Sequence, residues 1–157
     1  MEDFIAICKE RTTKAMDNFL RDLSFVPADK LTWKPTPTAK SALEIAAHCA
    51  GYSGRFASVI RAGKFPWSVE EFLDPIQSAI KSITTLEQAE TMLRKGIDDS
   101  LAALDTVKPE QVPSTIESPQ GQTPFKFFLT LPAMHLEKHG AQIDYLQTCW
   151  GDQEVHL

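Results

Sequence analysis

Hydrophobic residues recur at helical spacing in four long segments of the chain. In the first, over residues 2–23, an apolar stripe extends from Phe4 to Leu23. Residues three or four positions apart lie on the same side of a helix, so the stripe predicts an amphipathic helix with one face in the core. A connector follows, in which Pro35 and Pro37 oppose helix and favour an extended path.

The next two helices carry capping signals at their N-termini. A second helix over residues 41–61 begins with Ser41 and Glu44, and a third begins with the equivalent pair Thr85 and Gln88. In such a capping box the two side chains bond to backbone amides that the start of a helix leaves without partners. The spacing therefore fixes where both helices begin.

Two stretches rich in proline separate these helices from one another and from the last one. Residues 62–84 predict a long connector with a helical turn around 69–81. The third helix ends near Leu104, and residues 106–123, with three prolines and a glycine, predict a loop.

The last helix begins at Thr123 and Pro124, which we expect to act as the cap and the first helical residue. Its apolar stripe extends from Phe125 to Leu146, and Pro132 inside it predicts a kink. Four such helices and no convincing alternating strand predict an all-α fold, a four-helix bundle with long connectors between helices 2 and 3 and between helices 3 and 4.

Composition narrows the class of protein. A chain of 157 residues with 43% hydrophobic residues predicts one globular domain. The net charge of −5 and scattered cationic residues argue against a nucleic-acid partner. The start of the chain is neither basic nor continuously apolar, so we expect a cytoplasmic protein that does not span or bind a membrane. Cys8, Cys49 and Cys149 are widely spaced, and we expect buried thiols.

Three of the four histidines fall on the inward faces of the predicted helices. His135 and His139 are four residues apart, so their imidazoles can point toward one place, and His48 from the second helix would complete a facial site. Three neutral imidazoles predict a divalent metal ion with open positions for water or substrate. Imidazole suits zinc, nickel, iron and copper alike, and zinc or nickel is the ion that we expect.

Packing alone is the alternative interpretation of these histidines, since a buried histidine is commonly a hydrogen-bonded core residue. Burying three imidazoles without partners would cost roughly 1–3 kcal/mol each, whereas one ion satisfies all three. The coincidence of three inward histidines therefore favours a metal site.

The residues between the paired histidines argue against a peptidase. Metalloproteases of the His-Glu-x-x-His class place a glutamate directly after the first histidine, and that position is Leu136 here. Glu137 lies about 200° around the helix from each histidine, so it should point into solvent.

Four further residues lie near the predicted site. Gln142 would support a ligand, contact the substrate or form a polar contact between helices, and Tyr52 would line the site or belong to the core. Glu44 lies one turn before His48, although capping already accounts for it. Cys49 is rotated about 100° from His48 and is a poor ligand.

Three stretches of the chain form a recognisable set of motifs. They are Leu-Thr-Trp-Lys-Pro at residues 31–35, Ser-Ala-Leu-Glu-Ile-Ala-Ala-His at 41–48, and His-Leu-Glu-Lys-His-Gly-Ala-Gln-Ile at 135–143. In these stretches the chain resembles the DinB-like superfamily. Members of this superfamily are four-helix-bundle metalloenzymes, among them bacillithiol- and mycothiol-dependent transferases and related isomerases, and many are homodimers.

The resemblance implies specific roles for four residues. The metal-binding histidines of the family fall on His48, His135 and His139, and its His-x-x-Gln pattern falls on His139 and Gln142. A homodimer and a small-molecule substrate are further implications.

Two hypotheses about function follow. The first is an enzyme in which the metal lowers the pKa of a bound thiol or water. Its substrate would receive a low-molecular-weight thiol, as in an S-transferase, or would be hydrolysed. The second is a non-catalytic helical module in which the metal or a small ligand is structural or sensory. An open coordination position beside a pocket would distinguish the enzyme, and that pocket should be shaped by residues 62–84 and 106–123.

Overall fold

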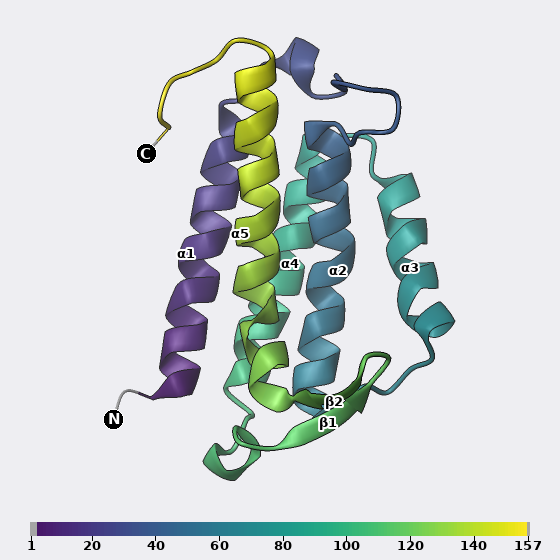
Figure 1. The fold of residues 1–157 in the computed structure, drawn as a ribbon, viewed down its shortest axis with the longest axis vertical. Coiled ribbons are helices and arrows are strands. Elements are labelled where there is room, and N and C mark those ends of the chain that lie inside the picture. Colours follow the sequence, from purple (N-terminus) through teal and green to yellow (C-terminus); the bar gives the residue numbers. More distant parts are fainter. Residues whose placement is uncertain (1–2, 157) are drawn as a thin grey trace.

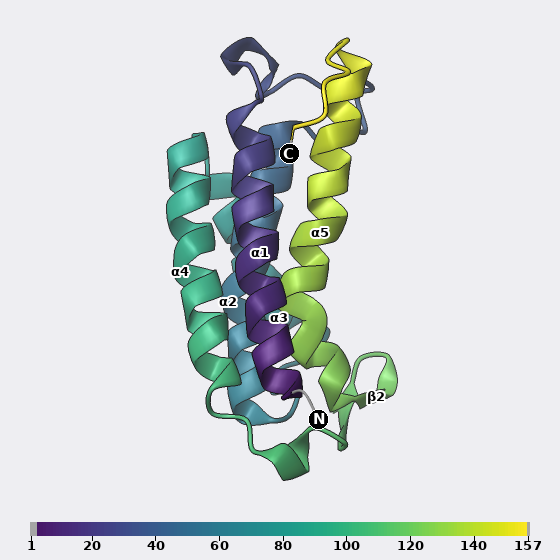
Figure 2. The same cartoon turned by 90° about the vertical axis from the view of Figure 1, so that its left-hand side faces the viewer.

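The computed structural model describes residues 3–156, which form five α-helices and a two-stranded sheet. The helices are α1 (Phe4–Ser24), α2 (Ala42–Ala62), α3 (Val69–Ser82), α4 (Leu86–Leu104) and α5 (Phe125–Cys149). Helices α1, α2, α4 and α5 lie side by side along the long axis, and α3 lies outside them against α2 (Figure 1, Figure 2). Short 3-10 turns occupy Ala28–Lys30 and Pro109–Gln111.

Side-chain caps start α2 and α4 where the sequence predicts them. The Glu44 amide donates to Ser41 Oγ at 3.3 Å, and the Ser41 amide donates to Glu44 Oε2 at 2.8 Å. Thr85 and Gln88 form the same reciprocal pair at the start of α4. These contacts satisfy amides that lack partners within the helix, so both predicted capping boxes are confirmed.

The hydrophobic core consists of two clusters of buried side chains. The larger is contributed by α1, α2, α4 and α5 and includes Phe19, Ile45 and Leu136. The second is nearer the hairpin and includes Ile60 and Phe125. Because α2 and α5 contribute to both clusters, their relative position is well determined by packing.

Helix α3 extends the helical turn that the sequence predicts into a full helix of 14 residues. Pro75 lies inside it and cannot donate to the carbonyl of Glu71, four residues earlier. Arg55 of α2 supplies the missing donor, since its Nη2 lies 3.2 Å from Glu71 O. The predicted long connector between the second and third helices is therefore wrong for residues 69–82.

The predicted loop over residues 106–123 contains an antiparallel hairpin. Strands β1 (Thr115–Ser118) and β2 (Gly121–Pro124) pair with Ser118 opposite Gly121, whose φ of +90° favours glycine. The expectations of an all-α fold and of only four helices are thus corrected to a mostly helical fold with a small sheet.

The expected cap of the last helix is also wrong. The Thr123 hydroxyl lies in β2 and is 2.9 Å from the Ser118 hydroxyl, so it bonds within the hairpin. Helix α5 begins at Phe125 after Pro124, which makes no side-chain capping bond. Pro132 lies inside α5, and the helix axis changes direction in its N-terminal part, as expected of an internal proline (Figure 2).

Two findings concern membrane crossing and the cysteines. Among residues 3–156, no helix combines the length and apolarity that a bilayer crossing requires. Cys8 and Cys49 are buried as expected, whereas Cys149 at the end of α5 is exposed.

Candidate metal centre

Helices α2 and α5 pack against each other and bring His48, His135 and His139 together. His48 lies in the first half of α2, and the other two occupy successive turns of α5 beyond Pro132. The candidate ligand nitrogens of the three rings all lie within 4.8 Å of one another. All three rings are partly buried. The structure thus brings together the three residues that the sequence predicts as ligands.

The spacing of the histidine nitrogens fits a shared divalent ion. Nε2 of His135 lies 3.2 Å from Nε2 of His48. Zinc binds imidazole nitrogen at about 2.0–2.1 Å, so two such ligands at angles of about 90–110° are separated by about 2.8–3.4 Å. The donor set therefore suits the ion without rearrangement of this pair.

Burial keeps the three imidazoles neutral. Burial, with a smaller contribution from the adjacent His139, lowers the pKa of His135 to about 3 and that of His48 to about 4. Burial also lowers the pKa of His139, and the ammonium groups of Lys40 and Lys138 act in the same direction. A neutral imidazole has a free lone pair, which is the form that binds a metal.

Gln142 lies where the His-x-x-Gln pattern predicts it, one turn beyond His139 on α5. Its Oε1 is 2.8 Å from Nδ1 of His139. Because the amide oxygen accepts, the ring donates from Nδ1 and its lone pair lies on Nε2. The contact therefore fixes both the orientation and the tautomer of His139, as a supporting residue does in metal sites.

Tyr52 packs beside the histidines rather than in the closed core. Its ring centroid lies 4.6 Å from that of His48 and 5.1 Å from that of His135. Phe56 of α2 also contacts His135, with ring centroids 5.3 Å apart. Burial raises the pKa of Tyr52, so its hydroxyl stays protonated at neutral pH and can donate a hydrogen bond.

The remaining acidic candidates are engaged elsewhere. Arg11 of α1 binds both carboxylate oxygens of Glu137, at 2.7 and 2.5 Å, so Glu137 points away from the histidines but is ion-paired rather than simply solvated. Glu44 caps α2 and accepts from Lys34 at 2.6 Å. Cys49 is completely buried, and burial raises its pKa, so it is not part of the cluster.

A cavity of about 800 Å³ adjoins the cluster and has His135 in its wall. As expected, residues 62–84 and 106–123 contribute to it, through Phe72 of α3 and Gln120 of the hairpin. Sequence reasoning missed the part of the wall formed by α5, including Phe127 and Leu131. The three phenylalanines between residues 125 and 128 were the available signal, although periodicity placed Phe125 and Phe128 on the core face and left Phe127 off it.

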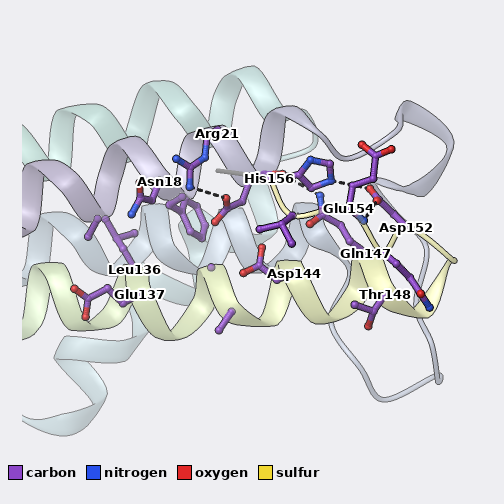
Figure 3. A pocket seen from close by; sticks show the side chains of 17 residues that line it. Asn18, Arg21, Leu136, Glu137, Asp144, Gln147, Thr148, Asp152, Glu154 and His156 are labelled. Carbon is purple, nitrogen blue, oxygen red and sulfur yellow. Dashed lines mark hydrogen bonds and ion pairs between the residues drawn. The ribbon is translucent and has the colours of Figure 1, made fainter.

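A second cavity, of about 640 Å³, lies between α1, α5 and the C-terminal segment (Figure 3). Its wall carries Arg21, Asp22, Asp144, Asp152 and His156, the fourth histidine. Nε2 of His156 is 2.9 Å from an oxygen of Asp152, and burial, followed by repulsion from Asp144, raises the pKa of Asp22. None of the clustered histidines lines this cavity, so it is separate from the candidate metal centre.

Known structures share the fold of this chain. A DinB-like protein, YjoA of Bacillus subtilis, aligns with a TM-score of 0.68 at 19% identity, over 96% of each chain. The mycothiol-dependent maleylpyruvate isomerase also aligns with a TM-score of 0.68, at 12% identity, over 91% of this chain and 63% of the isomerase. Among curated proteins, none is significantly similar in sequence.

A sequence profile describing the DinB superfamily matches residues 10–143. The matched region includes α2, most of α5 and therefore all three clustered histidines and Gln142. Since the match covers most of the chain and the fold agrees, this protein belongs to the DinB superfamily.

Proposed function

We propose that this protein is a divalent-metal-dependent enzyme that transfers a low-molecular-weight thiol to an electrophilic small molecule. The observation that carries the proposal is the convergence of three neutral imidazoles at the edge of a cavity. Membership of the DinB superfamily, and a fold shared with a protein named as mycothiol-dependent, support the choice of a thiol.

His48, His135 and His139 would hold the metal, with zinc or nickel the expected ion. Among residues 3–156, the cluster contains no fourth histidine, cysteine or carboxylate. Structural zinc sites are closed by four protein ligands, whereas catalytic sites keep a position open. A divalent ion bound here would lower the pKa of a thiol at that position.

The chain itself offers no thiol nucleophile at this place. Burial raises the pKa of Cys8 to about 11 and raises that of Cys49 as well, so both stay protonated at neutral pH. Neither of them, nor Cys149, lines the cavity within the described part of the chain. A thiol cosubstrate would supply the nucleophile, and Tyr52, whose ring lies beside His135 in the cavity wall, would donate a hydrogen bond to the substrate.

Metal analysis of wild type and a His135→Ala variant tests the proposal. We expect stoichiometric divalent metal in protein purified without chelator or nickel resin, and loss of that metal in the variant.

Gln142→Ala should keep the fold and weaken metal affinity by about 10–100-fold, because the orientation of His139 would be lost. Consumption of bacillithiol, mycothiol or glutathione in the presence of electrophiles should follow metal content.

His156→Ala is the matched control, because His156 is the histidine outside the cluster. It should retain both metal and thiol transfer. Equal metal content in wild type and His135→Ala would overturn the metal site. Bound metal with hydrolysis but no thiol consumption would favour a hydrolase, and bound metal with no turnover would favour a binding module. The homodimer and the cytoplasmic location remain predictions.

A further inference from the structure

We propose that the cavity beside the histidine cluster accepts an uncharged, planar aromatic group, so that the electrophile of this enzyme is a neutral aromatic compound. That this group belongs to an electrophile rests on the proposed function. That the group is neutral and aromatic rests on the residues of the cavity wall alone.

The walls of the cavity come from three helices, the hairpin and the connector before α3, which contributes Phe65. Tyr52 and Phe56 belong to α2, Phe72 to α3, and Phe127 to α5, while the hairpin contributes Gln120. The cavity volume of about 800 Å³ is within the range of about 300–1,000 Å³ that is typical of small-molecule sites. A ligand in this space would lie against His135 and thus next to the candidate metal.

The wall provides no charge to pair with an ionised substrate. None of its fourteen residues is Asp, Glu, Lys or Arg. The guanidinium of Arg55 is engaged nearby, 4.6 Å from the ring centroid of Trp67 and bonded to Glu71 O. A carboxylate buried away from the histidines would lose its hydration without gaining a partner, so the cavity disfavours it.

Aromatic rings form a continuous path from the histidines to α3. Tyr52 contacts His135 and also Phe72, with ring centroids 5.9 Å apart at an interplanar angle of 69°. Phe72 in turn contacts Phe65, with centroids 5.0 Å apart at 47°. Aromatic rings attract one another at such separations when they meet edge to face or at a tilt. An aromatic ring of a ligand can therefore pack against these side chains in the same way.

The mouth of the cavity exposes apolar surface that a ligand would cover. Phe127 is 42% exposed and Val69 is 52% exposed, and both line the cavity. Covering such surface is favourable because it removes apolar area from water. The few polar groups of the wall, among them the Tyr52 hydroxyl and the Gln120 amide, would orient the ligand rather than neutralise it.

Binding of 2-naphthol and 2-naphthoate distinguishes a neutral from an ionised aromatic group. Isothermal titration calorimetry would use the full chain after metal removal, so that the carboxylate cannot bind an ion. We expect 2-naphthol to bind at least about tenfold more tightly than 2-naphthoate. Leu131→Arg places a cation in the wall and should narrow or reverse that preference.

A pair of similarly exposed phenylalanines provides the control. Phe127, in the cavity wall, is 42% exposed, and Phe25, after the end of α1 and outside this cavity, is 43% exposed. Phe127→Ala should weaken 2-naphthol binding several-fold, whereas Phe25→Ala should leave it unchanged. Equal effects of the two substitutions, or wild-type affinity for 2-naphthoate equal to that for 2-naphthol, would overturn the inference.

The calorimetric readout separates this inference from the proposed function, since it requires neither metal nor thiol. Selective 2-naphthol binding in a protein that fails to consume thiols would leave the inference standing and reject the enzyme. Thiol transfer to ionised electrophiles alone would support the enzyme and overturn the inference. Absence of 2-naphthol binding together with a dimer that Phe127→Ala dissociates would show that a second copy covers the cavity, and would overturn the inference.

Discussion

Burial determines the protonation of the site histidines. Unperturbed histidine titrates near pH ~6.5, so the sequence alone predicts that protons compete with metal below that value. In the structure, burial lowers the pKa of His48 to about 4 and that of His135 to about 3. In the folded protein, competition at these two residues should therefore begin at a lower pH than the sequence predicts.

The same pKa shifts predict how the stability of the metal-free protein depends on pH. Below pH ~6.5 the unfolded chain binds protons at His48 and His135, whereas the native chain keeps both neutral down to about pH 4 and 3. The unfolded state then holds more protons than the native state. The free energy of unfolding should therefore fall as the pH is lowered from about 7 to about 5. Lys40, Lys138 and His139 add to the shifts. Urea unfolding at the two pH values measures the slope.

Paired variants identify the source of that slope. Replacing both His48 and His135 by alanine should reduce the slope, whereas His156→Ala leaves both residues and their share of the slope in place. An unchanged slope in the double variant would contradict the assignment. The sequence could predict that these rings face inward, because periodicity places them there. It could not predict their pKa, which depends chiefly on tertiary burial.

At the scale of elements, α2 and α4 approach closely at Gly96. A Cβ placed on Gly96 would lie 2.6 Å from the Cβ of Ser53 and 2.8 Å from the amide nitrogen of Gly54. Both neighbours belong to the middle of α2, so the two helices cannot easily separate to admit a methyl group. The Ser100 hydroxyl, within 3.1 Å of the Ser53 carbonyl, is also part of this close contact.

We expect Gly96→Ala to destabilise the protein by about 1–3 kcal/mol, the usual cost of overpacking a core. Gly54→Ala is the control, since no atom lies within 4 Å of a Cβ added there. In the middle of a helix that change should stabilise by roughly 0.5–1 kcal/mol. Urea denaturation of both variants gives the comparison, and a Gly96→Ala protein at least as stable as wild type would show that the helices can move apart.

The elements that the sequence missed depend on contacts that reach beyond a single helical turn. In the sequence, Pro75 predicts the end of a helix. Helix α3 nevertheless continues through it, because Arg55 of α2 donates to the Glu71 carbonyl that proline cannot bond. Thr123 and Pro124 resemble a local helix start, but Thr123 bonds across the hairpin to Ser118 instead. Arg55 is 16 residues from Glu71, and the contact of Thr123 with Ser118 forms only when the hairpin pairs. Capping boxes, in contrast, form within one turn of a helix and were predicted correctly.

At the scale of the whole molecule, a bound ion would connect two distant parts of the chain. His48 and His135 are separated by 87 positions in sequence and belong to different helices. An ion that binds the native state and not the unfolded chain stabilises the fold, by about 2.7 kcal/mol at a free concentration of 100 times its Kd. We therefore expect added zinc or nickel to raise the unfolding midpoint.

Thermal unfolding with and without metal tests this coupling. The rise should grow with metal concentration, disappear after chelation and be absent in His135→Ala, while His156→Ala should behave as wild type. An equal rise in wild type and His135→Ala would show that the ion acts elsewhere. A single cooperative transition is also expected, because α2 and α5 contribute to both core clusters and the sequence predicts one domain.

The position of α3 has a consequence for how this architecture can diversify. Among the helices, α3 packs chiefly against α2, yet it and the hairpin supply much of the wall that faces a ligand. The histidines, in contrast, sit on two helices that the rest of the bundle holds in place. Replacing one peripheral helix and one turn would thus change which compounds fit the cavity while the histidine cluster stays the same.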